Sequence, residues 1–350
     1  MIPSRVLIIS PNWIGDAIMA QPLLQLLRQR YPEVVIDVLA PAWVAPVWQA
    51  MEEVNLVHES AFRHGKLQLK DRWAMAKYLK TLDYDQAYVL PNTLKFALIP
   101  WLAGIPERIG YLGETRYGLL NVIHHDNKRH PRPMMAFYAA LIDKPSNNIN
   151  DRFESLHPRL YVDEKTVNDV KEKLNLKKGK MTIAFAPGAE FGSAKRWPVS
   201  HFSALAERII QCYPEAQIVL LGSNKDNDVC EAIHSNVPDT LNLAGKTNLK
   251  EAIELIAGID ILVTNDSGLM HVASAFDLPV LALYGSTDYR HTPPFSRQSH
   301  IMSLDLDCAP CQKRECPLGH HNCMKNLLPQ SVYEEVTKII IQNSSEKNNK

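Results

Sequence analysis

The chain has 350 residues, and its 38 Lys plus Arg balance its 38 Asp plus Glu to give a net charge of zero. The length favours two domains, and the balanced charge argues against nucleic acid as the main partner. No run approaches the roughly 20 apolar residues of a membrane span, and the N-terminus lacks the apolar core of a secretory signal. We therefore expect a cytoplasmic protein whose six cysteines are thiols or metal ligands rather than disulfides.

Short apolar runs in the first half predict buried strands at 5–10, 34–39, 86–90 and 108–111. A helical periodicity fills 17–30 and ends at Tyr31-Pro32-Glu33. This alternation of strand and helix is the signature of a parallel α/β sheet.

After a polar stretch over 147–170, interpreted as a linker, the same order returns. A strand is predicted at 181–187, a loop at 188–198, a helix at 199–212 that ends at Tyr213-Pro214-Glu215, and a strand at 217–222. The repeat predicts two Rossmann-like domains, at 1–165 and 166–329, with parallel sheets facing a central cleft. A helix at 330–343, packing back towards the first domain, and a disordered tail at 344–350 complete the prediction.

The stretch V-T-N-D-S-G-L-M-H-V-A-S-A over 263–275 joins a predicted strand at 259–263 to a helix start. Asp266 is predicted to cap a helix that begins with Ser267 and Gly268. The free N–H groups and the dipole of such a helix start attract anions, which predicts a phosphate site. His271, about one turn further on, is either a donor to the same anion or a packed core residue.

The loop at 188–198 also joins a strand to a helix, so Lys195 is expected to contact phosphate; the alternative is a solvated Lys195–Arg196 pair. The loop is not a Walker A motif, since Lys195 stands three residues beyond Gly192. No G-x-G-x-x-G follows the first strand of either domain, which disfavours an NAD-dependent epimerase or dehydrogenase.

Two carboxylates follow predicted strands. Asp16 is placed to take a proton from an incoming hydroxyl, or it is an ordinary first-turn Asp favoured by the helix dipole. Asp226 is placed to accept from a ribose hydroxyl, or it belongs to a helix N-cap region.

Four cysteines near the C-terminus have the spacing C-x2-C-x4-C-x6-C, at Cys308, Cys311, Cys316 and Cys323. They either hold a structural zinc ion or are free thiols, and the spacing is not that of a zinc ribbon. No catalytic metal is expected, because the other candidates show no matching ligand cluster.

Together these motifs resemble glycosyltransferase family 9, the bacterial ADP-heptose:lipopolysaccharide heptosyltransferases. The matching stretches are P-N-W-I-G-D (11–16), Y-V-L-P-N-T-L-K (88–95), A-G-I-P-E-R-I-G-Y (103–111), R-Y-G-L-L-N (116–121), P-G-A-E-F-G-S-A-K-R-W-P (187–198), V-T-N-D-S-G-L-M-H-V-A (263–273) and C-P-L-G-H-H-N-C (316–323). The resemblance implies a GT-B fold, with the active site between twin Rossmann-like domains.

The resemblance also implies an inverting transfer of L-glycero-D-manno-heptose from ADP-heptose to the first heptose of heptosyl-Kdo2-lipid A. Alternatives are an enzyme that adds the first heptose to Kdo2-lipid A, and a non-catalytic nucleotide-sugar binding protein. No divalent metal is implied for the chemistry.

The resemblance assigns roles to individual residues. Asp16 matches the general base, and Lys195 matches the lysine that offsets charge on the departing ADP. The implied donor-binding residues are Gly188, Lys195, Asp226, Thr247, Asp266, Ser267, Gly268 and His271. The expected acceptor-binding residues are Lys95 and Arg116.

Because that acceptor is a lipid, we expect peripheral contact with the cytoplasmic face of the inner membrane. Residues 128–132, K-R-H-P-R, are a candidate basic patch for this contact, or simply an exposed basic loop. Since Asp16 and the donor turn lie in different domains, catalysis is expected to require the two halves to close.

Overall fold

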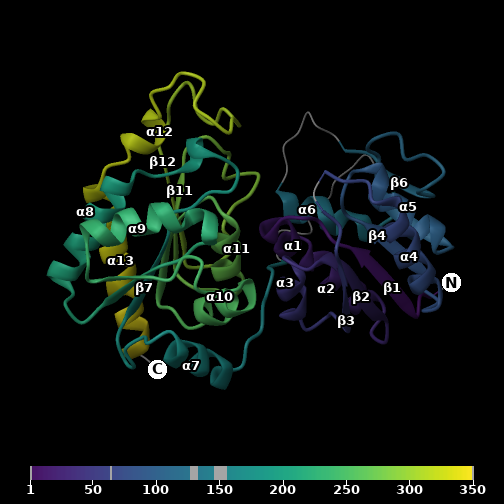
Figure 1. Cartoon of the computed structure of the whole chain (residues 1–350), viewed down its shortest axis with the longest axis horizontal. Helices are drawn as coiled ribbons and strands as arrows, with labels where there is room; N and C mark the ends of the chain where they lie inside the picture. The colour runs from purple at the N-terminus through teal and green to yellow at the C-terminus, as the bar shows by residue number, and fades with distance from the viewer. Residues whose placement is uncertain (1, 64, 127–132, 146–155, 349–350) are drawn as a thin grey trace. The chain divides into compact units, whose positions relative to one another are not determined.

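The computed structural model describes residues 2–63, 65–126, 133–145 and 156–348 (Figure 1). The chain divides into two compact units, Met1–Tyr161 and Val162–Lys350. This division falls a few residues before the predicted boundary at 165. Within the predicted linker the structure has a helix, α7 (Glu164–Lys173), whose N-cap Asp163 accepts from the Thr166 amide at 2.9 Å. The helix escaped the sequence analysis because Val170 is its one buried side chain, so it carries almost no apolar periodicity.

The first unit is a six-stranded parallel sheet in the order β3-β2-β1-β4-β5-β6. Its strands are β1 (Arg5–Ile9), β2 (Val35–Pro41), β3 (Leu56–Ser60), β4 (Gln86–Val89), β5 (Glu107–Tyr111) and β6 (Val122–His124). Its helices are α1 (Ile14–Met19), α2 (Gln21–Arg30), α3 (Ala45–Gln49), α4 (Leu69–Lys80), α5 (Leu94–Leu102), α6 (Met134–Ala139) and the 3-10 turn η1 (Ala140–Ile142). The predicted strands are confirmed, whereas β3 and β6 escaped prediction.

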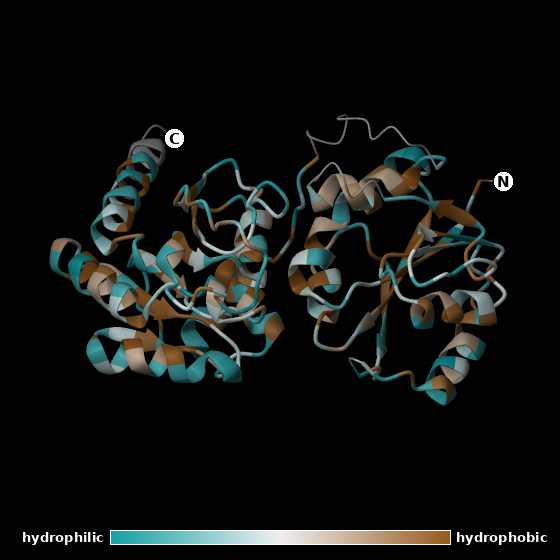
Figure 2. Cartoon of the chain, turned by 90° about the horizontal axis from the view of Figure 1, so that it is seen from above, coloured by the Kyte–Doolittle hydropathy of each residue, from teal (hydrophilic) through white to brown (hydrophobic). Residues whose placement is uncertain are grey.

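The helix predicted over 17–30 is two helices, which meet at Ala20. Pro22 stands in the first turn of α2, where its missing N–H costs no hydrogen bond, so the chain restarts a helix there. On the other side of the sheet, α4 and α5 share one apolar core with β1, β2 and β4. In Figure 2 the apolar colours gather on the strands and on the helix faces that cover them.

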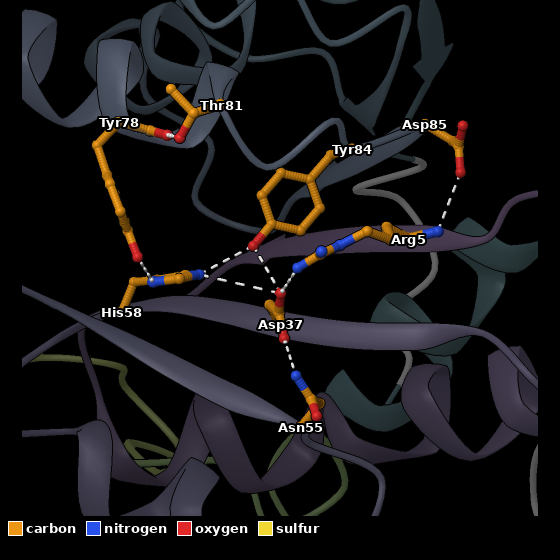
Figure 3. A network of polar contacts seen from close by, with 8 residues as sticks. All are labelled: Arg5, Asp37, Asn55, His58, Tyr78, Thr81, Tyr84 and Asp85. Atoms are coloured by element: carbon orange, nitrogen blue, oxygen red, sulfur yellow. Dashed lines mark hydrogen bonds and ion pairs between the residues drawn. The ribbon is translucent and has the colours of Figure 1, made fainter.

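A buried polar network ties the amino-terminal halves of β1, β2 and β3 together (Figure 3). The fully buried Asp37 carboxylate accepts from Arg5 Nη2 at 3.0 Å, from the Tyr84 hydroxyl at 2.7 Å and from Asn55 Nδ2 at 2.8 Å. His58 Nε2 lies 2.9 Å from the Tyr84 hydroxyl, and burial lowers the pKa of His58. Because every partner of Asp37 lies away from the carboxyl ends of the strands, the network is structural.

The second unit is another six-stranded parallel sheet, in the order β12-β11-β10-β7-β8-β9. Its strands are β7 (Thr182–Ala186), β8 (Gln217–Leu220), β9 (Thr240–Asn242), β10 (Ile261–Asn265), β11 (Val280–Tyr284) and β12 (Ser299–Ser303). Its remaining elements are η3 (Ser193–Lys195), α8 (Val199–Cys212), η4 (Asn224–Asp226), α9 (Asn227–Asn236), α10 (Leu249–Ile256), α11 (Gly268–Ala275), α12 (Asn322–Lys325) and α13 (Pro329–Asn348). The predicted helix over 199–212 is confirmed in full.

The last helix, α13, differs from its prediction in two respects. It was expected to pack towards the first domain, whereas its buried residues Val332, Val336 and Ile339 lie in the core of the second unit. The helix packs along α8 because these side chains recur every three or four positions and form one apolar stripe. The helix also runs to Asn348, through most of the predicted disordered tail.

Both sheets have a strand order that opens a ligand site at the carboxyl ends of their strands. In each unit the first strand lies inside the sheet, with the next strand of the chain on one side and a later strand on the other: β2-β1-β4 and β8-β7-β10. The loops after the first and the later strand therefore diverge, which is where ligands bind in doubly wound sheets.

Candidate active site

The turn after β10 starts a helix, as the sequence predicts, but one residue later and without the predicted cap. Ser267 has extended backbone angles, φ −146° and ψ 168°, and is the N-cap of α11, which begins at Gly268. Neither residue is fully buried, and no side-chain hydrogen bond caps this helix start. The first N–H groups of α11 are thus left for a ligand, and the dipole favours an anion there.

Asp266 binds a lysine instead of capping its own helix. Its Oδ2 accepts from Lys195 Nζ at 2.5 Å and from Thr287 Oγ1 at 2.6 Å. The side chains of Asp266 and Lys195 are only 6% and 13% exposed. The two meet because β7 and β10 are hydrogen-bonded neighbours, so the loops that follow them leave the sheet side by side. The pair holds an ammonium group beside the start of α11.

Asn265 fixes the Lys195 loop to the same turn. Its Nδ2 donates to the Pro187 carbonyl at 2.7 Å, and its Oδ1 accepts from the Trp197 amide at 3.1 Å. The buried Trp197 indole in turn donates to the Leu327 carbonyl at 2.7 Å. Both ends of the loop are therefore anchored, which limits where the lysine between them can move.

His271 is a buried, neutral residue behind the helix start. Its ring is 3% exposed and stacks on Phe295 with 5.5 Å between ring centroids. Burial lowers the pKa of His271 to about 4, although the nearby Asp266 opposes the shift. At neutral pH His271 therefore carries no charge, and of the two sequence alternatives the packed residue describes it better.

Asp226 is a capping residue at the next strand end. Its Oδ2 accepts from the Ser223 amide at 2.9 Å and from the Ser223 hydroxyl at 2.8 Å, which forms a capping box. A Cβ on Gly188 would lie 2.2 Å from Asp226 Oδ1, so the missing side chain lets this carboxylate approach the loop after β7. Thr247, partly buried, lies between β9 and α10. All the predicted donor residues thus follow neighbouring strands at one edge of the sheet, and the ribose role of Asp226 stays a prediction.

In the first unit, Asp16 lies in the first turn of α1, directly after β1, and is partly exposed. The buried Tyr138 of α6 is hydrogen-bonded to it. Burial and the Asp16 charge raise the pKa of Tyr138 well above its usual value, so the phenol stays protonated and donates to the carboxylate. Two exposed indoles, Trp13 and Trp43, lie on the loops at the same strand ends, and Trp43 Nε1 donates to the Asn12 carbonyl at 3.1 Å.

The two predicted acceptor residues differ. Lys95 is a partly exposed residue in the first turn of α5. Arg116 is completely buried, and its guanidinium donates to the Pro91 carbonyl at 2.6 Å and to the Tyr111 carbonyl. Burial lowers its pKa to about 10. The buried Arg116 side chain thus joins the chain after β4 to the chain after β5, and its acceptor role stays a prediction.

Residues 72–322 match a family model described as glycosyltransferase family 9 (heptosyltransferase). The chain belongs to glycosyltransferase family 9.

Individual relatives agree with this assignment. Lipopolysaccharide heptosyltransferase 2 of Escherichia coli (strain K12) is 39% identical over 346 residues, which cover 97% of this chain and 99% of that protein. The solved structure of E. coli ADP-heptose lps heptosyltransferase II, 37% identical, covers 97% of this chain and 99% of its own, with a TM-score of 0.85. Lipopolysaccharide heptosyltransferase 1 of Pseudomonas aeruginosa is 26% identical over 324 residues, 89% of this chain and 87% of that protein. The two parallel α/β units and this similarity confirm the predicted fold class.

In this family member the cysteine segment supports the loop that carries Lys195. The Arg314 carbonyl accepts from the Ala194 amide at 3.0 Å, next to Lys195, and the Gln312 backbone amide donates to the Ser286 carbonyl at 2.7 Å. A Cβ on Gly192 would lie 2.2 Å from the Arg314 carbonyl oxygen, so only glycine permits this approach. The segment thereby connects the Lys195 loop to the turn after β11.

The four cysteines of this segment, Cys308, Cys311, Cys316 and Cys323, line one cavity. The Cys316 sulfur accepts from the His321 amide at 3.5 Å, and backbone N–H groups, that one foremost, lower the pKa of Cys316. Within the described part of the chain, no group of three or more Cys, His, Asp or Glu side chains is placed to hold a metal ion. Structural zinc stays a hypothesis, which metal analysis of the purified protein tests.

Sequence reasoning missed three residues that contact the candidate residues: Asn265 and Thr287 in the second unit, and Tyr138 in the first. Asn265 is the last residue of β10 and Thr287 follows β11, so the rule that selected Asp16 and Asp226 at strand ends should also have selected them. Tyr138 gave no such signal, because it lies in the last turn of a short apolar helix and meets Asp16 only through the packing of α1 against α6.

Proposed function

We propose that this chain transfers L-glycero-D-manno-heptose from ADP-heptose to the first heptose of heptosyl-Kdo2-lipid A, with inversion at the anomeric carbon. The observation that carries the proposal is the near full-length identity of 39% to a lipopolysaccharide heptosyltransferase 2. The relative named heptosyltransferase 1 reaches 26% over a smaller share of the chain. That difference favours the second heptose over the first as the product of the reaction.

On the donor side, the start of α11 binds the diphosphate. The first N–H groups of the helix, around Gly268, donate to phosphate oxygens, and Lys195 neutralises the charge that grows on ADP as the glycosidic bond breaks. The 2.5 Å contact with Asp266 holds the ammonium in place before the donor arrives. Since the Asp266 charge is already compensated by Lys195 and hydrogen-bonded to Thr287, it repels phosphate less than a free carboxylate would.

On the acceptor side, Asp16 acts as the general base. Its carboxylate takes the proton of the acceptor hydroxyl while that oxygen bonds to the anomeric carbon and the bond to ADP breaks. The hydrogen bond from Tyr138 orients the carboxylate and leaves its other lone pairs for the acceptor. A single displacement of this kind inverts the anomeric centre.

Substitution of Asp16 separates an enzyme from a binding protein. Asp16→Ala should retain ADP affinity, because the donor residues lie in the second unit, and should lower the transfer rate by about 10²–10⁴-fold. Unchanged transfer would remove Asp16 as the base. A wild-type chain that binds ADP-heptose without transferring it would favour the non-catalytic alternative.

The acceptor is tested by one paired assay. Wild-type protein and ADP-heptose are incubated with Kdo2-lipid A and, separately, with the same lipid already carrying one heptose. We expect product from the second acceptor only, in the presence and in the absence of a chelator. Efficient transfer to Kdo2-lipid A would identify the first-heptose enzyme instead.

A lipid acceptor requires the protein to reach a membrane surface. In the described residues no helix is long and apolar enough to cross a bilayer. We infer peripheral contact with the cytoplasmic face of the inner membrane. The basic patch predicted at 128–132 lies outside the described residues.

A further inference from the structure

Large apolar side chains are exposed along α4 and α5 of the first unit. Leu69 and Trp73 are 55% and 53% exposed on α4, and Leu94 and Trp101 are 37% and 48% exposed on α5. Leu67, just before α4, is 48% exposed. Exposed apolar residues scattered singly need no explanation, but a cluster that includes two tryptophans marks an interaction surface.

These side chains lie on one layer of the unit. Residues 69 and 73 are four apart and residues 94 and 101 seven apart, so each pair shares a face of its helix. The two helices pack side by side on one face of the sheet (Figure 1). Buried Arg72 joins them: its Nε donates to the Leu67 carbonyl at 2.6 Å and its Nη1 to the Lys95 carbonyl at 3.1 Å. The starts of α4 and α5 are therefore close neighbours.

Lysines surround the apolar side chains. Residues 66–80 carry four exposed lysines, Lys66, Lys70, Lys77 and Lys80, and Asp71 as the one acidic residue. Lys77 Nζ lies 3.9 Å from the Trp73 ring centroid. Tryptophan and leucine flanked by lysines are the composition of a helix that lies in a membrane interface, where the rings sit at headgroup depth and the ammonium groups reach lipid phosphates.

We propose that this α4–α5 face, defined by Leu67, Leu69, Trp73, Leu94, Trp101 and the four lysines, docks on an anionic phospholipid surface. The proposal rests on the proposed function, since that acceptor is lipid-linked. A second copy of the chain is a poor occupant, because the lysines of one copy would face those of the other. Anionic headgroups complement the lysines, and each lysine near such a surface raises affinity about fivefold.

The position of the face fits delivery of a lipid-linked acceptor. Helices α4 and α5 begin after β3 and β4, so their first turns lie at the carboxyl edge of the parallel sheet. Asp16 follows β1 at the same edge. Leu69 and Leu94, in the first turns, place one end of the docking face on the side of this unit on which the proposed base lies, whereas Lys80 and Trp101 lie at the other end of the two helices.

Cosedimentation with vesicles tests the proposal. Wild-type protein should bind phosphatidylglycerol–phosphatidylcholine vesicles and bind pure phosphatidylcholine poorly. Lys66→Glu with Lys70→Glu should weaken binding at least 25-fold, since two contributions of about fivefold are lost. The control, Lys165→Glu with Lys178→Glu, changes equally exposed lysines of the second unit and should bind normally.

A second pair of variants tests the apolar contacts independently. Leu69→Ser with Trp73→Ser should weaken vesicle binding tenfold or more. In the wild type both apolar side chains move from water into the lipid interface, and the variant loses the free energy of that transfer. As a control, Tyr161→Ser with Ile341→Ser should bind vesicles like the wild type. These two residues are 63% and 59% exposed and lie outside α4 and α5. Equal losses in both pairs, or no binding by the wild type, would overturn the proposal. Self-association that only the α4–α5 variants abolish would show that the face binds a second copy instead.

Activity on two acceptors distinguishes docking from chemistry. On a water-soluble acceptor without acyl chains the docking variants should keep the wild-type kcat/KM, and on acceptor embedded in anionic vesicles they should lose activity as they lose binding. A wild-type chain that binds vesicles but leaves the soluble acceptor untouched would contradict the proposed function and not the docking face.

Discussion

Replacing Lys195 by methionine tests the proposed donor site most directly. The substitution keeps a long side chain on the anchored loop but removes the ammonium group. Asp266, which is 6% exposed, then keeps the hydrogen bond from Thr287 but has lost its counter-ion. One change thus has two consequences: an uncompensated buried carboxylate, and the loss of positive charge beside the start of α11.

The two consequences have different magnitudes. Breaking a buried ion pair from one side costs about 3–5 kcal/mol, and we expect about 3 kcal/mol because the Lys195 side chain is still 13% exposed. For a unit of this size each kcal/mol lowers the Tm by about 2–4 °C, so the Tm should fall by about 6–12 °C. Removing one preorganised group that stabilises developing charge lowers kcat by about 10²–10³-fold.

The double variant Lys195→Met with Asp266→Asn separates them. It removes both charges and keeps a polar partner for Thr287, so most of the lost Tm should return. The transfer rate, measured as ADP release at saturating acceptor, should stay as low as in Lys195→Met. If activity returned together with stability, Lys195 would only hold the turn in shape. If Lys195→Met left the Tm unchanged, the pair would not be the buried contact described.

Three further outcomes are expected. Tyr138→Phe should lower kcat/KM about tenfold and shift the acidic limb of its pH profile, because a hydrogen bond to a charged group contributes about 1.5–3 kcal/mol; an unchanged profile would leave Tyr138 a packing residue. Burial lowers the pKa of His124 to about 4. Since the unfolded value is about 6.5, the unfolded state binds the proton first, and stability should fall as pH drops from about 6.5 to 4. Denaturant titrations should show a shallower fall in His124→Gln. Arg116→Met should lower the Tm by several degrees, since buried carbonyl oxygens lose their donor. The KM for the acceptor should stay unchanged at temperatures where the variant is folded. A raised KM with an unchanged Tm would instead support direct contact between Arg116 and the acceptor.

Local patterns carried much of the fold and the position of the site. The apolar runs that became β1, β7 and β10 are buried on both faces, so each reads as a continuous hydrophobic stretch. The turn at 263–275 was recognisable because strand, small residues and helix follow each other directly in the chain. The same kind of local pattern did not predict α7 and β3. Both elements expose much of their surface, so their apolar residues do not recur with a helix or strand period.

The pairing of side chains was decided by the tertiary structure. Aspartate is a common helix cap, so the local sequence predicts that role for Asp266. Only the hydrogen-bonded pairing of β7 with β10 brings it to Lys195, 71 positions away in the chain. Arginine often binds ligands, which suggested that role for Arg116. In the folded protein its side chain is buried and donates to the Pro91 and Tyr111 carbonyl groups, and no local sequence pattern predicts these partners. By itself the sequence determined the most strongly buried strands, the helix over 199–212 and the helix start after β10, because those depend on neighbours along the chain. Which charged groups meet there depended on strand order and burial, which exist only in the folded protein.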